Sequence, residues 1–176
     1  MVSDVLQNGG KYTVYEIAQA IVTANSDSQF TLNPDIKSQV IDCGLDGVPE
    51  LLVEVSFNER NIEEYVLHMI IKDIGGELVQ CYDGISWSRS NIVVNYDGTI
   101  EGDGSGGAVV HYYDYAFVDA YGNYHFYYGL EETYELYGDY NAYTVGENCT
   151  KSLARWLFYT ESLRQRFFNK KVAIYG

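Results

Sequence analysis

A short acidic loop near residue 45 carries the residue types best suited to chemistry. Asp42, Asp46 and Glu50 place three carboxylates at four-residue intervals, and Val48 can add a backbone carbonyl. Calcium takes six to eight oxygen ligands, and acidic loops with a sharp glycine turn supply them at alternate positions. Gly47 would provide that turn. The spacing therefore predicts a calcium site formed by Asp42, Asp46, Val48 and Glu50.

The same loop also fits a β-turn that is stabilised by aspartate and glycine without any metal. The third position of a full calcium loop is occupied here by Gly44, and the twelfth position by Val53, so neither offers a side-chain oxygen. At most three carboxylates remain for an ion. Both interpretations stay open at the level of the sequence.

A second candidate site is a series of tyrosines, of which the chain has 18. Tyr134, Tyr137, Tyr140 and Tyr143 recur at three-residue intervals. Flat aromatic faces stack on the apolar faces of sugar rings, so this segment is a candidate ligand-binding surface. The same spacing is also typical of a helical turn that packs its tyrosines inward.

Residues typical of catalysis form no recognisable pattern. His68, His111 and His125 fall on separate predicted strands and lack the spacing of a zinc site, so we expect them to be structural. The glycine-rich stretch 102–107 is followed by a strand rather than by the helix that a nucleotide loop needs, which predicts a flexible turn. We therefore expect no enzymatic activity, and no cofactor other than calcium.

Hydrophobic periodicity predicts a single α+β domain over residues 1–176. Apolar residues at helical spacing indicate an N-terminal helix over 13–25, and Thr150 is a plausible N-cap for a C-terminal helix over 151–169. Between the helices we expect a meandering antiparallel sheet of about six to eight strands. The predicted strands cover 38–42, 51–57, 64–73, 77–82, 92–96, 109–119 and 124–136, with a further short strand at 171–175.

The predicted hairpin over 109–136 allows a face assignment. With its turn at Tyr121-Gly122-Asn123, odd positions of the first strand share a face with even positions of the second. The resulting apolar face, which we expect to be in the core, contains Tyr113, Tyr115, Phe117, Tyr124, Phe126, Tyr128 and Leu130. The opposite face contains Tyr112, Asp114, Ala116, His125, Tyr127, Gly129 and Glu131.

Charge is unevenly distributed along the chain. The formal net charge is -14, and residues 150–176 hold six basic residues and one acidic residue, a net of +5, which leaves -19 for residues 1–149. The basic segment is expected to pack against the acidic body of the domain, and the alternative is a helix that binds a partner or a membrane surface. A surface this acidic repels nucleic acid, so we expect no nucleic-acid partner. No run of apolar residues is long enough for a transmembrane helix.

The acidic loop also carries a family resemblance. The stretch from Val40-Ile41-Asp42 through Asp46-Gly47-Val48-Pro49-Glu50-Leu51-Leu52-Val53 resembles the D-x-D-G-x-P-E-L element of uncharacterised extracytoplasmic proteins and lipoproteins of Firmicutes. In that family the element follows a helix and opens a run of β-hairpins. The resemblance implies secretion or cell-surface anchoring, and it implies no enzymatic activity. The first ten residues show no export signal, so the alternatives are a cytoplasmic location or a signal that has been removed.

These observations support three hypotheses about function. The first is a non-enzymatic secreted or cell-surface module that binds a ligand or a protein partner. The second is a carbohydrate-binding accessory module. The third is a cytoplasmic acidic protein of the immunity type that binds a basic partner. Cys43, Cys81 and Cys149 form no closely spaced pair, and we expect them to be free thiols.

Overall fold

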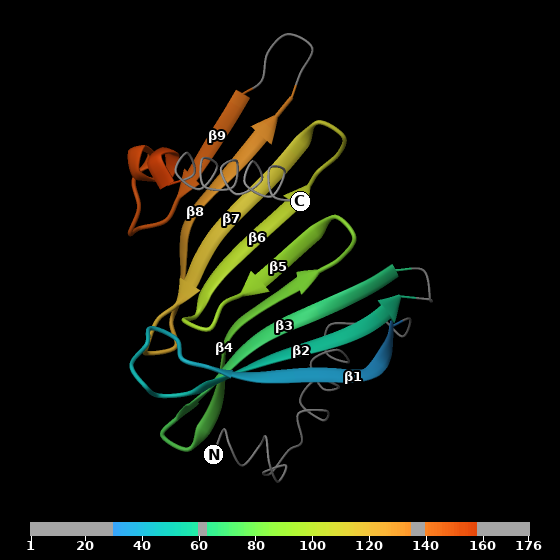
Figure 1. Cartoon of the computed structure of the whole chain (residues 1–176), viewed down its shortest axis with the longest axis vertical. Coiled ribbons are helices and arrows are strands. Elements are labelled where there is room, and N and C mark those ends of the chain that lie inside the picture. The colour runs from blue at the N-terminus through green and yellow to red at the C-terminus, as the bar shows by residue number, and fades with distance from the viewer. Residues whose placement is uncertain (1–29, 60–62, 135–139, 158–176) are drawn as a thin grey trace, which may run out of the picture.

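A computed structural model describes residues 30–59, 63–134 and 140–157, which form two antiparallel sheets (Figure 1). Sheet A has the order β1-β2-β3-β4, and sheet B has the order β5-β6-β7-β8-β9. In sheet A the strands are β1 (Phe30–Ile41), β2 (Glu50–Glu59), β3 (Glu63–Ile74) and β4 (Glu77–Ser86). In sheet B they are β5 (Ser90–Val94), β6 (Thr99–Ser105), β7 (Val110–Val118), β8 (Tyr124–Thr133) and β9 (Tyr140–Val145).

The predicted α+β class is wrong, because the described residues are nearly all β. They hold nine strands and one short helix, residues 151–157. The Thr150 hydroxyl accepts a hydrogen bond from the Leu153 N–H at 3.2 Å and so caps this helix. The predicted helix over 13–25, the remainder of the helix predicted over 151–169 and the strand predicted at 171–175 lie outside the described residues.

Two segments that were not predicted as strands account for much of the difference. The glycine-rich stretch, predicted as a turn, contributes most of β6, and part of the tyrosine series forms β9. Glycine has a low intrinsic preference for strands. However, β6 lies between β5 and β7 and pairs with both, so its backbone groups are satisfied on each side. Tertiary pairing thus outweighs local propensity.

The hairpin of β7 and β8 has a different register from the predicted one. Its turn spans residues 119–123, and a β-bulge at Tyr127 lies between the pairs Ala116–Phe126 and Tyr115–Tyr128. Tyr124 and Phe126 therefore lie on the face of Ala116 and not on the predicted core face. Beyond the bulge the prediction holds, because Tyr113 pairs with Leu130 and Tyr115 with Tyr128. The rings of Tyr115 and Tyr128 stack with centroids 4.6 Å apart.

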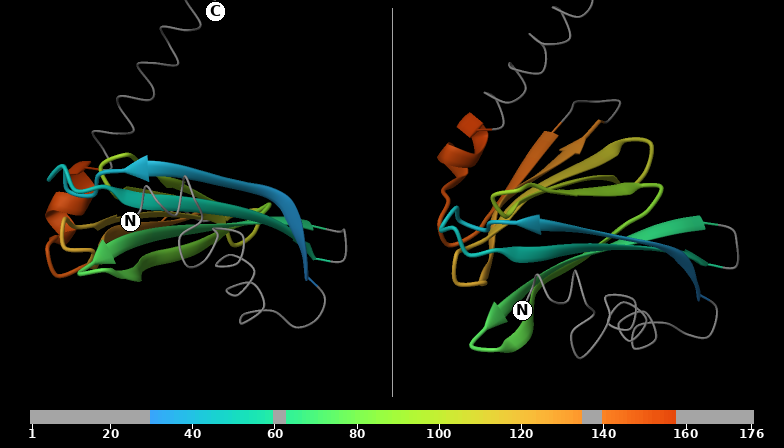
Figure 2. Two further views of the ribbon diagram at one scale, coloured as in Figure 1. Left: turned by 90° about the horizontal axis from the view of Figure 1, so that it is seen from below. Right: turned by 60° about the horizontal axis from the view of Figure 1, so that its bottom comes forward.

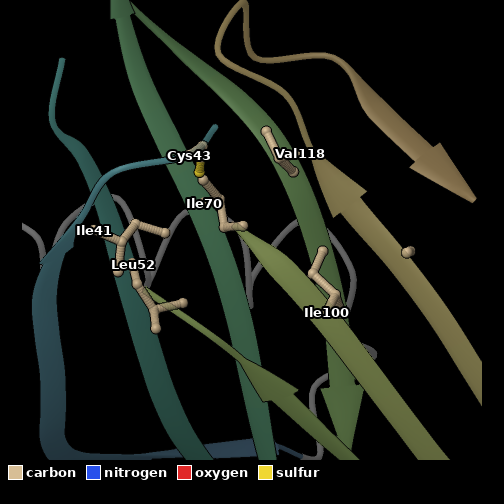
Figure 3. Packing of buried hydrophobic residues seen from close by; sticks show 7 residues of the cluster. Ile41, Cys43, Leu52, Ile70, Ile100 and Val118 are labelled. Atoms are coloured by element: carbon tan, nitrogen blue, oxygen red, sulfur yellow. The ribbon is translucent and has the colours of Figure 1, made fainter. Parts of the chain in front are cut away.

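The two sheets converge at one end and fan apart toward the other (Figure 1, Figure 2). At the converging end, buried side chains of both sheets form a common cluster. Ile41, Leu52 and Ile70 come from sheet A, Ile100, Ala116 and Val118 come from sheet B, and Cys43 from the loop after β1 completes the cluster (Figure 3). This cluster joins the sheets into one packed unit.

Main-chain hydrogen bonds strengthen the same junction. The N–H of Asp42 donates to the carbonyl of Tyr96 at 2.8 Å, and the N–H of Gly44 donates to the carbonyl of Asp97 at 2.9 Å. Gly98 has a φ of 85°, and a Cβ there would lie 2.8 Å from both the Cys43 Sγ and the Val118 carbonyl oxygen. Only glycine combines that backbone conformation with so close an approach.

The shared cluster predicts a large effect of truncating Ile70, whose exposed fraction is 0%. We expect Ile70→Ala to lower the free energy of unfolding by about 3 kcal/mol, because it leaves a cavity between the sheets. Val93→Ala is the matched control, since Val93 is 46% exposed on β5. Urea unfolding followed by fluorescence measures both variants. An equal loss in the two variants would contradict the proposed core.

The turn between β7 and β8 predicts a pH effect. Partial burial opposes the charge of Asp119, but hydrogen bonds from His125, Asn123 and Tyr121 outweigh it and hold the pKa of Asp119 well below its ordinary value. We expect Asp119→Asn to lower the free energy of unfolding by about 1–2 kcal/mol at pH 7.

A depressed pKa stabilises the fold above the unfolded pKa of about 3.9, and this stabilisation is lost as the pH falls toward the folded value. The difference between wild type and Asp119→Asn should therefore shrink between pH 5 and pH 3, as measured by denaturant unfolding at each pH. A difference that grows with acidity would be inconsistent with this account.

Candidate functional site

The acidic loop that was predicted to bind calcium is a tight turn whose carboxylates bind backbone N–H groups. Both carboxylate oxygens of Asp42 lie 3.1 Å from the Gly47 nitrogen, and the Asp46 Oδ1 accepts the N–H of Val48 at 2.8 Å. Asp46 and Val48 are exposed. The two aspartates therefore stabilise this turn by accepting hydrogen bonds from its backbone N–H groups.

Glu50, the fourth predicted ligand, is fully buried and forms an ion pair with Lys72. It also accepts the N–H of Cys43 at 2.7 Å. Burial opposes the charge of Lys72, but the Glu50 carboxylate outweighs it and raises the pKa of Lys72. Within the described ranges no three His, Cys, Asp or Glu side chains are grouped closely enough to hold a metal ion. Calcium binding by this loop stays a prediction.

Of the four tyrosines in the predicted binding surface, Tyr134 and Tyr143 have described side chains, and Tyr140 and Tyr143 both fall on β9. Tyr143 lies under the Arg155 guanidinium, 5.4 Å from the ring centroid, and Tyr134 donates to Glu132 at 2.9 Å. Tyr137 lies outside the described residues. Ligand binding by the four tyrosines stays a prediction.

A groove of about 540 Å³ opens over strands β4 to β8, within the size range of small-molecule sites. Five aromatic side chains line it: Tyr82, Trp87, Tyr112, Tyr124 and Phe126. Trp87, Tyr112 and Tyr124 are 42%, 39% and 46% exposed, so their rings are accessible to a ligand. Tyr82 and Tyr124 stack at 5.6 Å with an interplanar angle of 16°.

The floor of the groove lacks side chains because of the glycines of β6. Gly102 pairs with Ile92 and with Asp114, and Gly104 pairs with Ser90 and with Tyr112, so both glycines face the groove. A Cβ at Gly102 would meet its nearest atom, the Asp114 Cβ, at an ordinary 3.5 Å. Packing therefore does not require glycine at position 102. Because glycine has no side chain, the floor of the groove is open at this position.

Two carboxylates, Asp103 and Asp114, line this aromatic groove without an ion-pair partner among the described residues, and Asp103 accepts a hydrogen bond from Asn91 at 3.2 Å. Burial raises the pKa of Asp114, and burial together with Tyr124 and the nearby carboxylates Asp83 and Asp114 raises the pKa of Tyr82 to about 12. A Cβ at Gly129 would lie only 2.5 Å from the Asp114 Oδ1. Glycine at position 129 thus leaves room for the Asp114 carboxylate.

Beside the groove, three polar side chains form a hydrogen-bonded row across sheet A. The Nδ1 of His68 on β3 lies 2.9 Å from the Glu54 Oε1 on β2, and its Nε2 lies 2.8 Å from the Ser86 Oγ at the end of β4. The N–H of Ile92, a groove residue, donates to the same Oγ at 2.9 Å. His68 is buried, whereas Ser86 and Glu54 are half-buried.

Sequence reasoning missed both of these arrangements. Glu54, His68 and Ser86 are separated by 14 and 18 residues, and only the register of β2, β3 and β4 brings them together. The sequence held a partial signal of the groove, because Tyr112 falls on the face opposite the predicted core and the glycines at 102 and 104 recur with the period of a strand. Because residues 102–107 were predicted to form a flexible turn, this two-residue period was not interpreted as a strand.

Comparison with protein-family models, with curated proteins and with solved structures gives no match. The family resemblance of the acidic loop accordingly stays a prediction. None of the helices in the described part of the chain is long and apolar enough to cross a membrane.

The buried ion pair predicts a strong effect of removing its cation. Lys72→Met leaves the Glu50 charge buried without compensation, and we expect it to lower the free energy of unfolding by about 3 kcal/mol. Because the folded pKa of Lys72 is raised, the stabilisation by its charge is complete at neutral pH and is lost as the pH rises through that folded pKa.

Lys37→Met is the matched control, since Lys37 is exposed on β1, and its effect should stay within about 0.5 kcal/mol. Glu50→Gln combined with Lys72→Met removes both charges and should recover part of the loss. Denaturant unfolding at pH 7 measures all three proteins. A double variant less stable than Lys72→Met would contradict the ion-pair explanation.

Proposed function

We propose that this chain is a ligand-binding module that takes a carbohydrate in the groove over β4 to β8. The observation that carries the proposal is the bare floor of the groove. Glycine in the interior of a strand costs about 0.5–1 kcal/mol relative to alanine, and it often marks a site where a ligand approaches the backbone closely. Packing does not require glycine at position 102, so the cost is explained by the space that glycine leaves for a ligand.

The walls of the groove match the chemistry of a sugar ring. Pyranose rings present apolar C–H faces that stack on aromatic side chains, and the rings of Tyr112, Tyr124 and Trp87 are each more than a third exposed. Sugar hydroxyls need fixed hydrogen-bond acceptors and donors. The Asp114 carboxylate supplies acceptors on the face of Gly102.

An extracellular or cell-surface location is part of the proposal. Its support is the resemblance of the acidic loop to extracytoplasmic proteins. Fractionation of the natural host into cytoplasm, cell envelope and medium, followed by detection with an antibody, tests this location. Recovery in the cytoplasm alone would refute it.

The binding proposal predicts that filling the floor of the groove abolishes binding. Gly102→Val places a branched side chain where the ligand would lie, and it suits the strand, so the free energy of unfolding should not fall. We expect wild type to bind at least one glycan on an array and Gly102→Val to lose at least about tenfold in affinity, which is 1.4 kcal/mol. Titration calorimetry with the best glycan provides the affinities.

Gly107→Val is the matched control, because a Cβ at Gly107 meets nothing within 4 Å and this residue does not line the groove. Its affinity should equal that of wild type. Two results would refute the proposal: the absence of any bound glycan, or an affinity of stable Gly102→Val equal to that of wild type.

A further inference from the structure

We propose that Ser86 is a nucleophile toward carboxylic esters, with His68 as its general base and Glu54 as the residue that positions the imidazole. The proposal rests on the row of three side chains across sheet A, and it is independent of the nature of the ligand in the groove. It also departs from the expectation, drawn from the sequence, that His68 is merely structural and the chain is not an enzyme.

The hydrogen bonds of the row define the state of the imidazole. A carboxylate only accepts hydrogen bonds, so the contact of 2.9 Å with Glu54 requires the proton on His68 Nδ1. In the neutral ring the Nε2 is then an acceptor, and the Ser86 hydroxyl, whose Oγ lies 2.8 Å away, donates to it. A serine oxygen bonded to an imidazole that a carboxylate orients is the arrangement that activates serine for acyl transfer on several unrelated folds.

The surroundings of the row favour a neutral base next to a reachable hydroxyl. Burial lowers the pKa of His68 and outweighs the opposite effect of the Glu54 carboxylate, so the imidazole is unprotonated at neutral pH. Ser86 is half-buried at the end of β4, and its neighbours Trp87 and Ile92 line the groove. A substrate in or beside the groove can therefore approach the hydroxyl.

The reaction that follows is an ordinary acyl transfer to water. The Ser86 Oγ forms a bond to the ester carbonyl carbon while its proton passes to the His68 Nε2. The bond to the leaving alkoxide then breaks, and the alkoxide takes that proton and departs as the alcohol. Water attacks the acyl-serine in the same way, which releases the carboxylic acid and restores the serine hydroxyl and neutral histidine.

The N–H of Ile92 gives this site a donor for the charge that develops on the carbonyl oxygen. In the resting structure this N–H donates to the Ser86 Oγ at 2.9 Å. Once the Oγ is bonded to carbon, the oxyanion lies next to it, within reach of the same N–H. Donors aimed at that oxygen stabilise the transition state of acyl transfer.

A fluorophosphonate probe tests the proposal with the full chain. Such a probe phosphonylates an activated serine by displacing fluoride, and mass spectrometry of peptides locates the label. We expect labelling of wild type at Ser86, none in Ser86→Ala, and a rate at least about 100-fold lower in His68→Gln, the usual contribution of a general base. Ser38→Ala, which removes an exposed serine of β1 outside both the row and the groove, should label at the wild-type rate.

Substitution of Glu54 should leave the hydrophobic core intact, because the Glu54 side chain is 35% exposed. Glu54→Gln should slow labelling, and Glu54→Asp should recover part of the rate, which a merely structural residue would not produce. Circular dichroism confirms that each variant is folded. The proposal is overturned if folded wild type is not labelled at Ser86. It is also overturned if folded Glu54→Gln and folded His68→Gln are both labelled as fast as wild type.

Discussion

The close approach of the two sheets at Gly98 is the constraint on which the rest of the structure depends. The space that a Cβ would need there is taken by the Cys43 Sγ and the Val118 carbonyl oxygen, each 2.8 Å away, and the backbone adopts a φ of 85°. Main-chain bonds from Asp42 and Gly44 tie the loop after β1 to the turn between β5 and β6. With the sheets held together at this end, Ile70 of sheet A packs in the same cluster as Ile100 and Val118 of sheet B.

Convergence at one end has consequences at the other, where the sheets fan apart (Figure 1). Beyond the shared cluster lie the aromatic groove and the polar row of sheet A. Gly102 and Gly104 leave the floor of the groove open, and the row of Glu54, His68 and Ser86 takes the place of a hydrophobic layer on sheet A. Binding and reactivity, as proposed above, are therefore located where the core ends.

The errors of the sequence-based prediction have specific causes. The glycine-rich stretch lacks local strand propensity, but pairing with β5 and β7 on its two sides makes it a central strand. The single bulge at Tyr127 moves Tyr124 and Phe126 to the groove face, because one extra residue reverses the face of the side chains on one side of the bulge. Part of the tyrosine series, whose three-residue spacing is also typical of a helical turn, forms strand β9 instead.

The sequence by itself determined the antiparallel meander, the turn at Asp42–Gly47 and the shared face of Tyr113 and Leu130 beyond the bulge. These features depend on residues close in the chain and on the period of two. Only the tertiary structure decided that Glu50 pairs with Lys72, that Tyr124 lines a groove, and that Glu54, His68 and Ser86 meet. These contacts join different strands, and their geometry depends on register and bulges, which no single segment of the chain encodes.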